Sequence, residues 1–148
     1  MLDKKLFSLV IENTPLISID LIVENSKKKI LLGKRVNEPA KGFWFVPGGR
    51  IFKDETLDSA FQRTIKEEIG IDMSRNKSNF YGLYEHFYEK NVFDNAFSTH
   101  YIVLAHQITT ESELKLNDQH ELYQWFDKDE LLERNDVHRY TKNYFREN

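Results

Sequence analysis

The sequence predicts an α+β domain in which a mixed β-sheet is sandwiched between helices, an α/β/α arrangement. Three observations predict it. Short apolar segments rich in β-branched and aromatic residues recur along the chain, segments with helical periodicity lie among them, and the two kinds do not alternate as they do in a doubly wound fold. No repeat or flexible linker interrupts the 148 residues, so we expect one domain over residues 1–148.

Composition excludes several classes of function. Charged residues make up 30% of the chain but nearly balance, with a net charge of -3, so no basic surface for nucleic acid is expected. The chain has no cysteine, which excludes disulfides, thiolate zinc sites and cysteine nucleophiles. No apolar stretch approaches the ~20 residues that span a bilayer, and residues 1–10 lack a signal-peptide apolar run. We expect a cytoplasmic protein that binds neither nucleic acid nor membrane.

Three short strands are expected in the first third of the chain. Residues 16–23 (LISIDLIV) are largely apolar and β-branched, broken by one acid, Asp20, which indicates a buried strand with one exceptional polar position. Residues 30–32 (ILL) follow a basic turn and are expected to be its hairpin partner. Residues 43–46 (FWFV) form a short strand that stops at the Pro-Gly-Gly turn of residues 47–49.

A helix is expected next, over residues 56–69. Its apolar residues fall at helical spacing: Leu57, Ala60, Phe61, Ile65 and Ile69. Asp54 or Thr56 is suited to cap its N-terminus, and Gly70 to end it.

The second half of the chain predicts more strands and then short helices. Strands are expected at residues 80–88 (FYGLYEHFY), 100–108 (HYIVLAHQI) and 122–126 (LYQWF), followed by a short helix at residues 127–133. A last helix is expected to present one face made of Val137, Tyr140, Thr141, Tyr144 and Phe145.

Charged residues around the helix of residues 56–69 point to a bound cation. Arg63 and Glu67 are four residues apart, so they share a face, and Arg63 could bridge Glu67 to Glu55 in the preceding loop. Glu68 lies about 100° further around the helix and is left for a ligand. A carboxylate and a backbone carbonyl aimed by Gly48 would supply the hard oxygen ligands that suit Mg²⁺ or Mn²⁺.

The full spacing resembles the Nudix hydrolase box, which is Gly, five residues, Glu, seven residues, then Arg-Glu-apolar-any-Glu-Glu-any-Gly-apolar. The corresponding residues here are Gly49, Glu55, Arg63, Thr64, Ile65, Glu67, Glu68, Gly70 and Ile71. Every fixed position matches except Thr64, where the box has Glu. The resemblance implies the Nudix fold over the whole domain. The missing Glu implies that the usual metal-assisted attack of water at phosphorus is either lost or replaced by a variant.

Further stretches resemble one divergent Nudix family, the GDP-mannose mannosyl hydrolases, which also lack that Glu. They are PLISIDLIVENS, LLGKRVNEPAKGFWFVPGGRIFKDETLDSAF, YGLYEHFYE, STHYIVLAH, LNDQHELYQWF and NDVHRY. The resemblance implies a homodimer that uses one Mg²⁺, which Mn²⁺ is expected to replace. It implies that water attacks sugar C1 with inversion and releases GDP and the free hexose from a GDP-sugar.

The same resemblance implies a set of site residues. The metal ligands would be the Gly48 carbonyl, the Glu68 carboxylate and the Gln119 side chain, and the general base would be His120. Because the leaving GDP gains negative charge, guanidinium groups are suited to hold its phosphates. The residues assigned to the phosphates or to the substrate pocket are Arg35, Arg50, Tyr101, Asp20 and His86. Apart from the resemblance, Lys34 is assigned to the nucleotide because it neighbours Arg35, and Phe7 because its ring could stack on guanine.

Three hypotheses remain at this point. The first is hydrolysis of GDP-mannose, or of GDP-glucose, at the glycosyl carbon. The second is a conventional Nudix diphosphatase that releases GMP and sugar 1-phosphate; Thr64 argues against it, and Glu67 keeps it open. The third is a non-catalytic domain that binds nucleotide sugars, which would have no need of His120.

Overall fold

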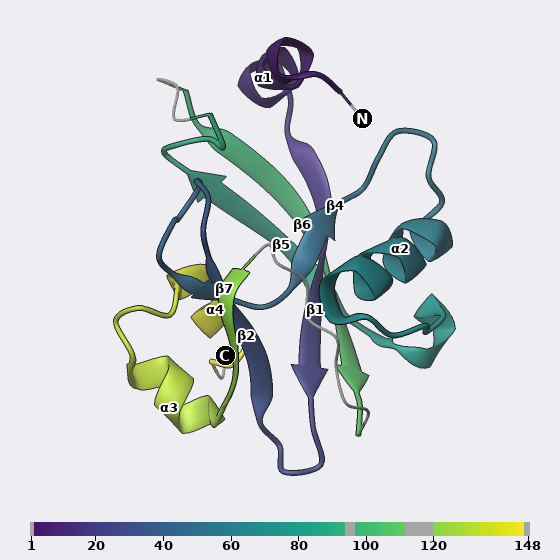
Figure 1. Ribbon diagram of the computed structural model, residues 1–148, viewed down its shortest axis with the longest axis vertical. Helices are drawn as coiled ribbons and strands as arrows, with labels where there is room; N and C mark the ends of the chain where they lie inside the picture. The colour runs from purple at the N-terminus through teal and green to yellow at the C-terminus, as the bar shows by residue number, and fades with distance from the viewer. Residues whose placement is uncertain (1, 94–96, 112–119, 147–148) are drawn as a thin grey trace.

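The computed structural model describes residues 2–93, 97–111 and 120–146, with the backbone alone at residues 120–122 (Figure 1). Its strands are β1 (Leu16–Glu24), β2 (Ile30–Arg35), β3 (Trp44–Phe45), β4 (Gly48–Arg50), β5 (Asn79–Tyr88), β6 (Thr99–Thr109) and β7 (His120–Phe126). Its helices are α1 (Lys4–Asn13), α2 (Leu57–Ile69), α3 (Lys128–Glu133) and α4 (Arg139–Asn143), with a 3-10 turn η1 (Arg75–Lys77). In the described residues, no helix is long and apolar enough to cross a membrane.

The strands form one seven-stranded mixed sheet with β1 at its centre. The main order is β3-β2-β1-β6-β5, with β4 also paired to β1 and β7 to β2. The pairing of β1 with β6 is parallel, from Leu16 opposite Tyr101 to Glu24 opposite Thr109, and the other pairings are antiparallel. The predicted α+β class and mixed sheet are therefore confirmed.

Alternate residues of β1 face two separate layers of the core, as expected from the two-residue period of a strand. Ile19, Leu21 and Val23 pack with the apolar face of α2. Ile22 packs in the opposite cluster with Leu131 and the residues near the C-terminus. Figure 1 shows α2 on one side of β1 and the pair α3 and α4 on the other. The helices thus cover both faces of the sheet, as the sequence predicts.

The ends of α2 follow directly from its sequence. Thr56, and not Asp54, caps the N-terminus, because its side chain accepts a hydrogen bond from the Ser59 amide at 3.1 Å. Gly70 ends the helix in the left-handed region at φ 75°, which glycine adopts without strain. The helix therefore places Glu68 and Arg63 at fixed distances from the loop before it.

Three local expectations differ from the structure. The Pro-Gly-Gly segment was expected to be a turn, but its two glycines begin strand β4, in which Gly48–Arg50 pairs with Ser18–Asp20 of β1. The last helix is shorter than expected, and Val137 instead bridges to Trp44 beside the sheet. Helix α1 was not expected, because Ile11 is the one buried residue in it and its pattern is therefore weak.

Candidate active site

A pocket opens where β1 changes its antiparallel partner. Next to the hairpin, Glu24 of β1 pairs with Ile30 of β2, whereas Ser18–Asp20 pairs with β4 instead. The cavity there has a volume of about 240 Å³. It is lined by Phe7, Ile11, Ser18, Asp20, Arg35, Asn37, Glu38, Pro39, Phe45, Val46, Gly48, Gly49, Arg50, Glu68, Tyr88, Val92, Thr99 and Tyr101.

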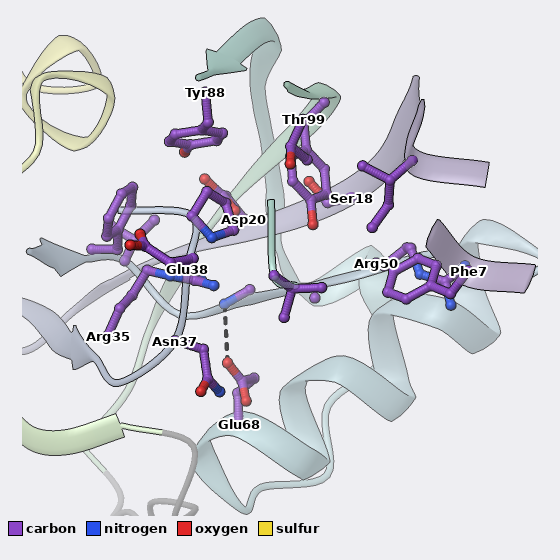
Figure 2. A pocket seen from close by; sticks show the side chains of 18 residues that line it. Phe7, Ser18, Asp20, Arg35, Asn37, Glu38, Arg50, Glu68, Tyr88 and Thr99 are labelled. Atoms are coloured by element: carbon purple, nitrogen blue, oxygen red, sulfur yellow. Dashed lines mark hydrogen bonds between the residues drawn. The ribbon is translucent and has the colours of Figure 1, made fainter. Parts of the chain in front are cut away.

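Two arginines line opposite sides of this pocket. Figure 2 shows Arg35 on one side and Arg50 on the other, with Asp20 and Glu68 between them. Among the described residues, neither guanidinium forms an ion pair. The buried Nε of Arg35 also has no hydrogen-bond partner there. Guanidinium groups left without an acidic partner in a cavity are suited to bind an anion.

Tyr101 lies on β6, where the charges of both arginines act on its hydroxyl group. Burial raises the pKa of its hydroxyl, and the charges of Arg35 and Arg50 partly oppose that rise. The hydroxyl therefore stays protonated at neutral pH and can donate a hydrogen bond into the pocket.

Asp20 is the acidic group of β1 in this pocket. Burial raises its pKa to about 7, although a hydrogen bond from Tyr144 and the charge of Arg35 both favour the carboxylate. The nearby charge of Glu68 adds to the rise. The Tyr144 hydroxyl donates to the Asp20 Oδ2 atom at 2.5 Å.

Arg63 binds the loop before α2 in the way the sequence predicts. Its Nε and Nη2 atoms donate to the two carboxylate oxygens of Glu55 at 2.7 and 2.8 Å. The Nη2 atom also donates to the backbone carbonyl of Arg50 at 2.8 Å, and Nη1 donates to Glu67 at 3.1 Å. The hydrogen bonds from Arg63 lower the pKa of Glu55. One guanidinium thus joins α2, the preceding loop and the end of β4.

The acidic residues of α2 take different positions relative to the pocket. Glu68 is 3% exposed and lines it, and its Oε1 atom accepts a hydrogen bond from the Gly48 amide at 3.3 Å. The Glu67 side chain is 59% exposed and pairs with Arg63 outside the pocket lining. Thr64 is buried against Gly49, where a Cβ atom would lie 3.4 Å from the Thr64 methyl carbon. Of the box positions at the end of α2, Glu68 alone brings a carboxylate to the cavity.

The remaining predicted residues lie less directly at the pocket. His86 is buried behind it, with Nε2 3.5 Å from the Tyr144 hydroxyl, and burial lowers its pKa to about 4. Lys34 on β2 is not among the lining residues. The backbone of His120 pairs opposite Arg35 in the β2–β7 register. Gln119 lies outside the described residues.

A match to the NUDIX domain model covers residues 14–146. The chain belongs to the NUDIX family. Its fold is that of a Nudix domain, and the match includes the box helix α2. The family assignment thus agrees with the box spacing in the sequence.

Two curated Nudix relatives are similar in sequence. The low-salt glycan biosynthesis protein Agl8 of Haloferax volcanii is 40% identical over 112 residues, 75% of this chain and 70% of Agl8. An ADP-ribose pyrophosphatase of Methanocaldococcus jannaschii is 46% identical over 57 residues, 38% of this chain and 33% of that protein.

A solved structure supports the fold independently. The MutT protein of Methanosarcina mazei Go1 has a TM-score of 0.72 at 23% identity, and the match covers 90% of this chain and 92% of that chain. Identity at this level bears on the fold and not on the substrate.

Nudix hydrolases generally use a divalent metal ion. The oxygen donors of this pocket suit a metal ion that is bound partly by the protein and partly by the substrate phosphates. Among the described residues, no group of three His, Cys, Asp or Glu side chains could hold a metal ion. Mg²⁺ commonly takes one or two carboxylates and completes its shell with waters and substrate phosphates. The Glu68 carboxylate beside Gly48 fits that pattern, whereas a cage made wholly of protein carboxylates does not.

Several pocket residues were missed by sequence reasoning. Asn37 and Glu38 follow the predicted Arg35 by two and three positions, so their nearness to it could have suggested them. Tyr88 lies two residues after His86 on the same strand, so it shares a face with a predicted site residue and could have been predicted as well. Tyr144, which does not line the pocket but contacts Asp20, offered no such signal, because it is 124 residues from that carboxylate.

We expect Arg63→Met to lower the free energy of unfolding by about 2 kcal/mol at pH 7, since it removes charge-assisted hydrogen bonds from partly buried partners. The pKa of Glu55 is lowered in the folded state, so this stabilisation is present above the ordinary Glu pKa and is lost as the pH falls through the lowered value. Urea denaturation of both proteins between about pH 3 and pH 7, the range in which carboxyl groups titrate, should show the difference in unfolding free energy narrowing in acid.

A matched control is Arg75→Met, which removes the more exposed pair with Asp58. We expect it to cost less than about 0.5 kcal/mol at any pH in that series. Equal effects of the two substitutions would contradict the structural role assigned to Arg63.

Proposed function

We propose that this Nudix hydrolase cleaves a GDP-hexose, with GDP-mannose as the first candidate, to GDP and the free hexose. Water attacks sugar C1 from the face opposite the diphosphate, so the configuration at C1 is inverted. The C1–O bond to the β-phosphate breaks, the electron pair stays with the phosphate oxygen, and a new C1–O bond forms to the water.

The observation that carries this proposal is the position of Thr64. Attack at phosphorus in an ordinary Nudix enzyme uses several box carboxylates to hold metals and orient water. Here Thr64 is buried under Gly49, and Glu67 points its exposed carboxylate to Arg63. A pocket with one box carboxylate is poorly equipped for that chemistry and better suited to stabilising a leaving diphosphate.

The two arginines suit that leaving group. As the C1–O bond breaks, negative charge grows on the β-phosphate, and cations already in place stabilise it without reorganising. Arg35 and Arg50 flank the pocket without acidic partners among the described residues, and the Tyr101 hydroxyl is available as a donor. These groups stabilise the transition state more than the bound substrate, because the additional negative charge on the β-phosphate develops only during cleavage.

The ends of the pocket differ in character, which suggests how the substrate lies. Phe7 lies at one end of the pocket in Figure 2, and its ring is suited to stack on the guanine ring. The Phe7 ring lies 4.6 Å from the Arg50 guanidinium, so base and phosphate subsites would adjoin there. Asp20 and Glu38 lie towards the other end in Figure 2, where their oxygens can accept hydrogen bonds from sugar hydroxyls.

A general base and a metal complete the proposal. We assign the base to His120, whose backbone lies opposite Arg35, and whose imidazole would take the proton of the attacking water. Glu68 and the Gly48 carbonyl, with Gln119, are the proposed ligands of Mg²⁺ or Mn²⁺. The ion, when bound, would neutralise charge on the departing diphosphate.

The two curated relatives support two different candidate reactions. The printed name of the Haloferax volcanii relative, a glycan biosynthesis protein, supports a sugar-nucleotide substrate. The match to an ADP-ribose pyrophosphatase favours the second candidate, cleavage within the diphosphate to GMP and sugar 1-phosphate. The longer match and the buried Thr64 make the first candidate the stronger one.

Product analysis in ¹⁸O-labelled water separates these two functions. With GDP-mannose and Mg²⁺, we expect unlabelled GDP and mannose that carries the label, because the new bond forms to carbon. Mass spectrometry of both products provides the measurement, and the anomer released, read by proton NMR before mutarotation, reports inversion. Labelled GMP or labelled mannose 1-phosphate would instead establish attack at phosphorus.

His120→Ala separates an enzyme from a binding domain. We expect kcat to fall by roughly 10²–10⁴-fold, the usual contribution of a general base, with the Kd for GDP and Mg²⁺ nearly unchanged in calorimetry. His100→Ala is the matched control, since His100 stacks on Phe87 and is not among the pocket-lining residues. Turnover by His120→Ala at the rate of the His100→Ala protein would refute the assignment of the base.

A further inference from the structure

The two oxygens of the Asp20 carboxyl lie against groups from distant parts of the chain. The Tyr144 hydroxyl donates to Oδ2 at 2.5 Å. Oδ1 lies over Gly48, where a Cβ atom on that residue would come within 2.5 Å of it. Glycine thus makes room for one oxygen while a phenol holds the other, so the plane of the carboxyl is fixed at the pocket wall.

Tyr144 is itself rigidly placed. It is 2% exposed, and its ring packs edge-on against Tyr84 with the ring centroids 4.7 Å apart. Its backbone carbonyl accepts a hydrogen bond from the Tyr81 hydroxyl. Upstream, the amide of His138 donates to Trp44 at 3.1 Å, which ties the C-terminal segment to the sheet. A hydroxyl anchored in this way orients its partner and does not merely follow it.

We propose that Tyr144 is a positioning residue of the active site, which acts through Asp20 by holding one carboxyl oxygen so that the other faces the substrate. Its hydroxyl is directed at the pocket from the core side, and Tyr144 is not itself a lining residue. It therefore does not touch the substrate. The catalytic part of this inference rests on the proposed function, whereas the contact between Tyr144 and Asp20 does not.

The groups around Asp20 explain why orientation matters. Arg35 acts on it from β2, and Glu68 acts on it from α2. Without the hydroxyl, the carboxyl can rotate towards the Arg35 guanidinium, since the positive charge of Arg35 attracts the carboxylate. Such a rotation would draw Arg35 away from the diphosphate and remove the Asp20 oxygen from the sugar. The loss would appear in the transition state more than in substrate binding.

The test compares Tyr144→Phe with Tyr84→Phe, which removes a hydroxyl from the ring packed against Tyr144. For Tyr144→Phe we expect kcat to fall by about 10–100-fold, as for the loss of a hydrogen bond to a charged group, while KM changes by less than about 3-fold. Tyr84→Phe should keep both constants. Wild-type kcat in Tyr144→Phe, or an equal loss in Tyr84→Phe, would overturn the proposal.

A double-mutant cycle with Asp20→Ala shows whether Tyr144 acts through Asp20. We expect that adding Tyr144→Phe to Asp20→Ala lowers kcat no further, because the group being positioned is already absent. Fully additive losses would mean that Tyr144 supports the fold or the site by another route, and would overturn the assignment.

A measurement without substrate keeps this inference separate from the proposed function. In proton NMR of the free protein, a hydroxyl hydrogen bonded to a carboxylate in a buried site exchanges slowly and resonates downfield. We expect one such resonance in the wild type, its loss in both Tyr144→Phe and Asp20→Ala, and its retention in Tyr84→Phe. Absence of the resonance from the wild type, or its survival in Asp20→Ala, would refute the contact even if GDP-hexose turnover is established.

Discussion

The close approach of Gly48 to β1 is the constraint on which the site depends. A Cβ atom at Gly48 would lie 2.5 Å from the Asp20 Oδ1 atom and 2.6 Å from the Ile19 carbonyl, so this pairing requires glycine. The pairing brings the Gly48 amide to Glu68 and sets Arg50 at the end of β4. Asp20, Glu68 and Arg50 reach one cavity because β4 pairs with β1. A side chain at Gly48 would prevent that pairing.

Charge is divided between a structural network and the pocket. Arg63 binds Glu55 through two hydrogen bonds and also pairs with Glu67, which commits two of the box carboxylates to holding α2 against its loop. Glu68 is the box carboxylate that remains at the cavity, between two guanidinium groups. Arg35 and Arg50 thus offer two guanidinium groups to a diphosphate, beside the acidic lining residues Asp20, Glu38 and Glu68.

What the sequence could predict was local. The box residues of α2 lie on one helix and its adjoining loop, so the Arg63 bridge and the separate position of Glu68 followed from helix geometry. The central strand was equally clear, because residues 16–23 of β1 are mostly apolar and Asp20 is the one acid among them. These features depend on periods of two and 3.6 residues, which a single sequence displays.

What it could not predict depends on contacts between distant segments. Strand β4 has the composition of a turn and becomes a strand only because β1 offers it a partner. Tyr144 was expected on a helix face, and its contact with Asp20 crosses the whole chain. Lys34 was expected at the substrate because it neighbours Arg35, but it is not among the pocket-lining residues.

The most direct test of this account is a crystal structure of the protein with GDP and Mg²⁺. The account predicts that the β-phosphate contacts both Arg35 and Arg50, that the ion joins it to Glu68, and that guanine lies against Phe7. A diphosphate bound away from the two arginines, or an ion held by Glu67 in place of Glu68, would contradict the central claim that this pocket is built to stabilise a leaving GDP.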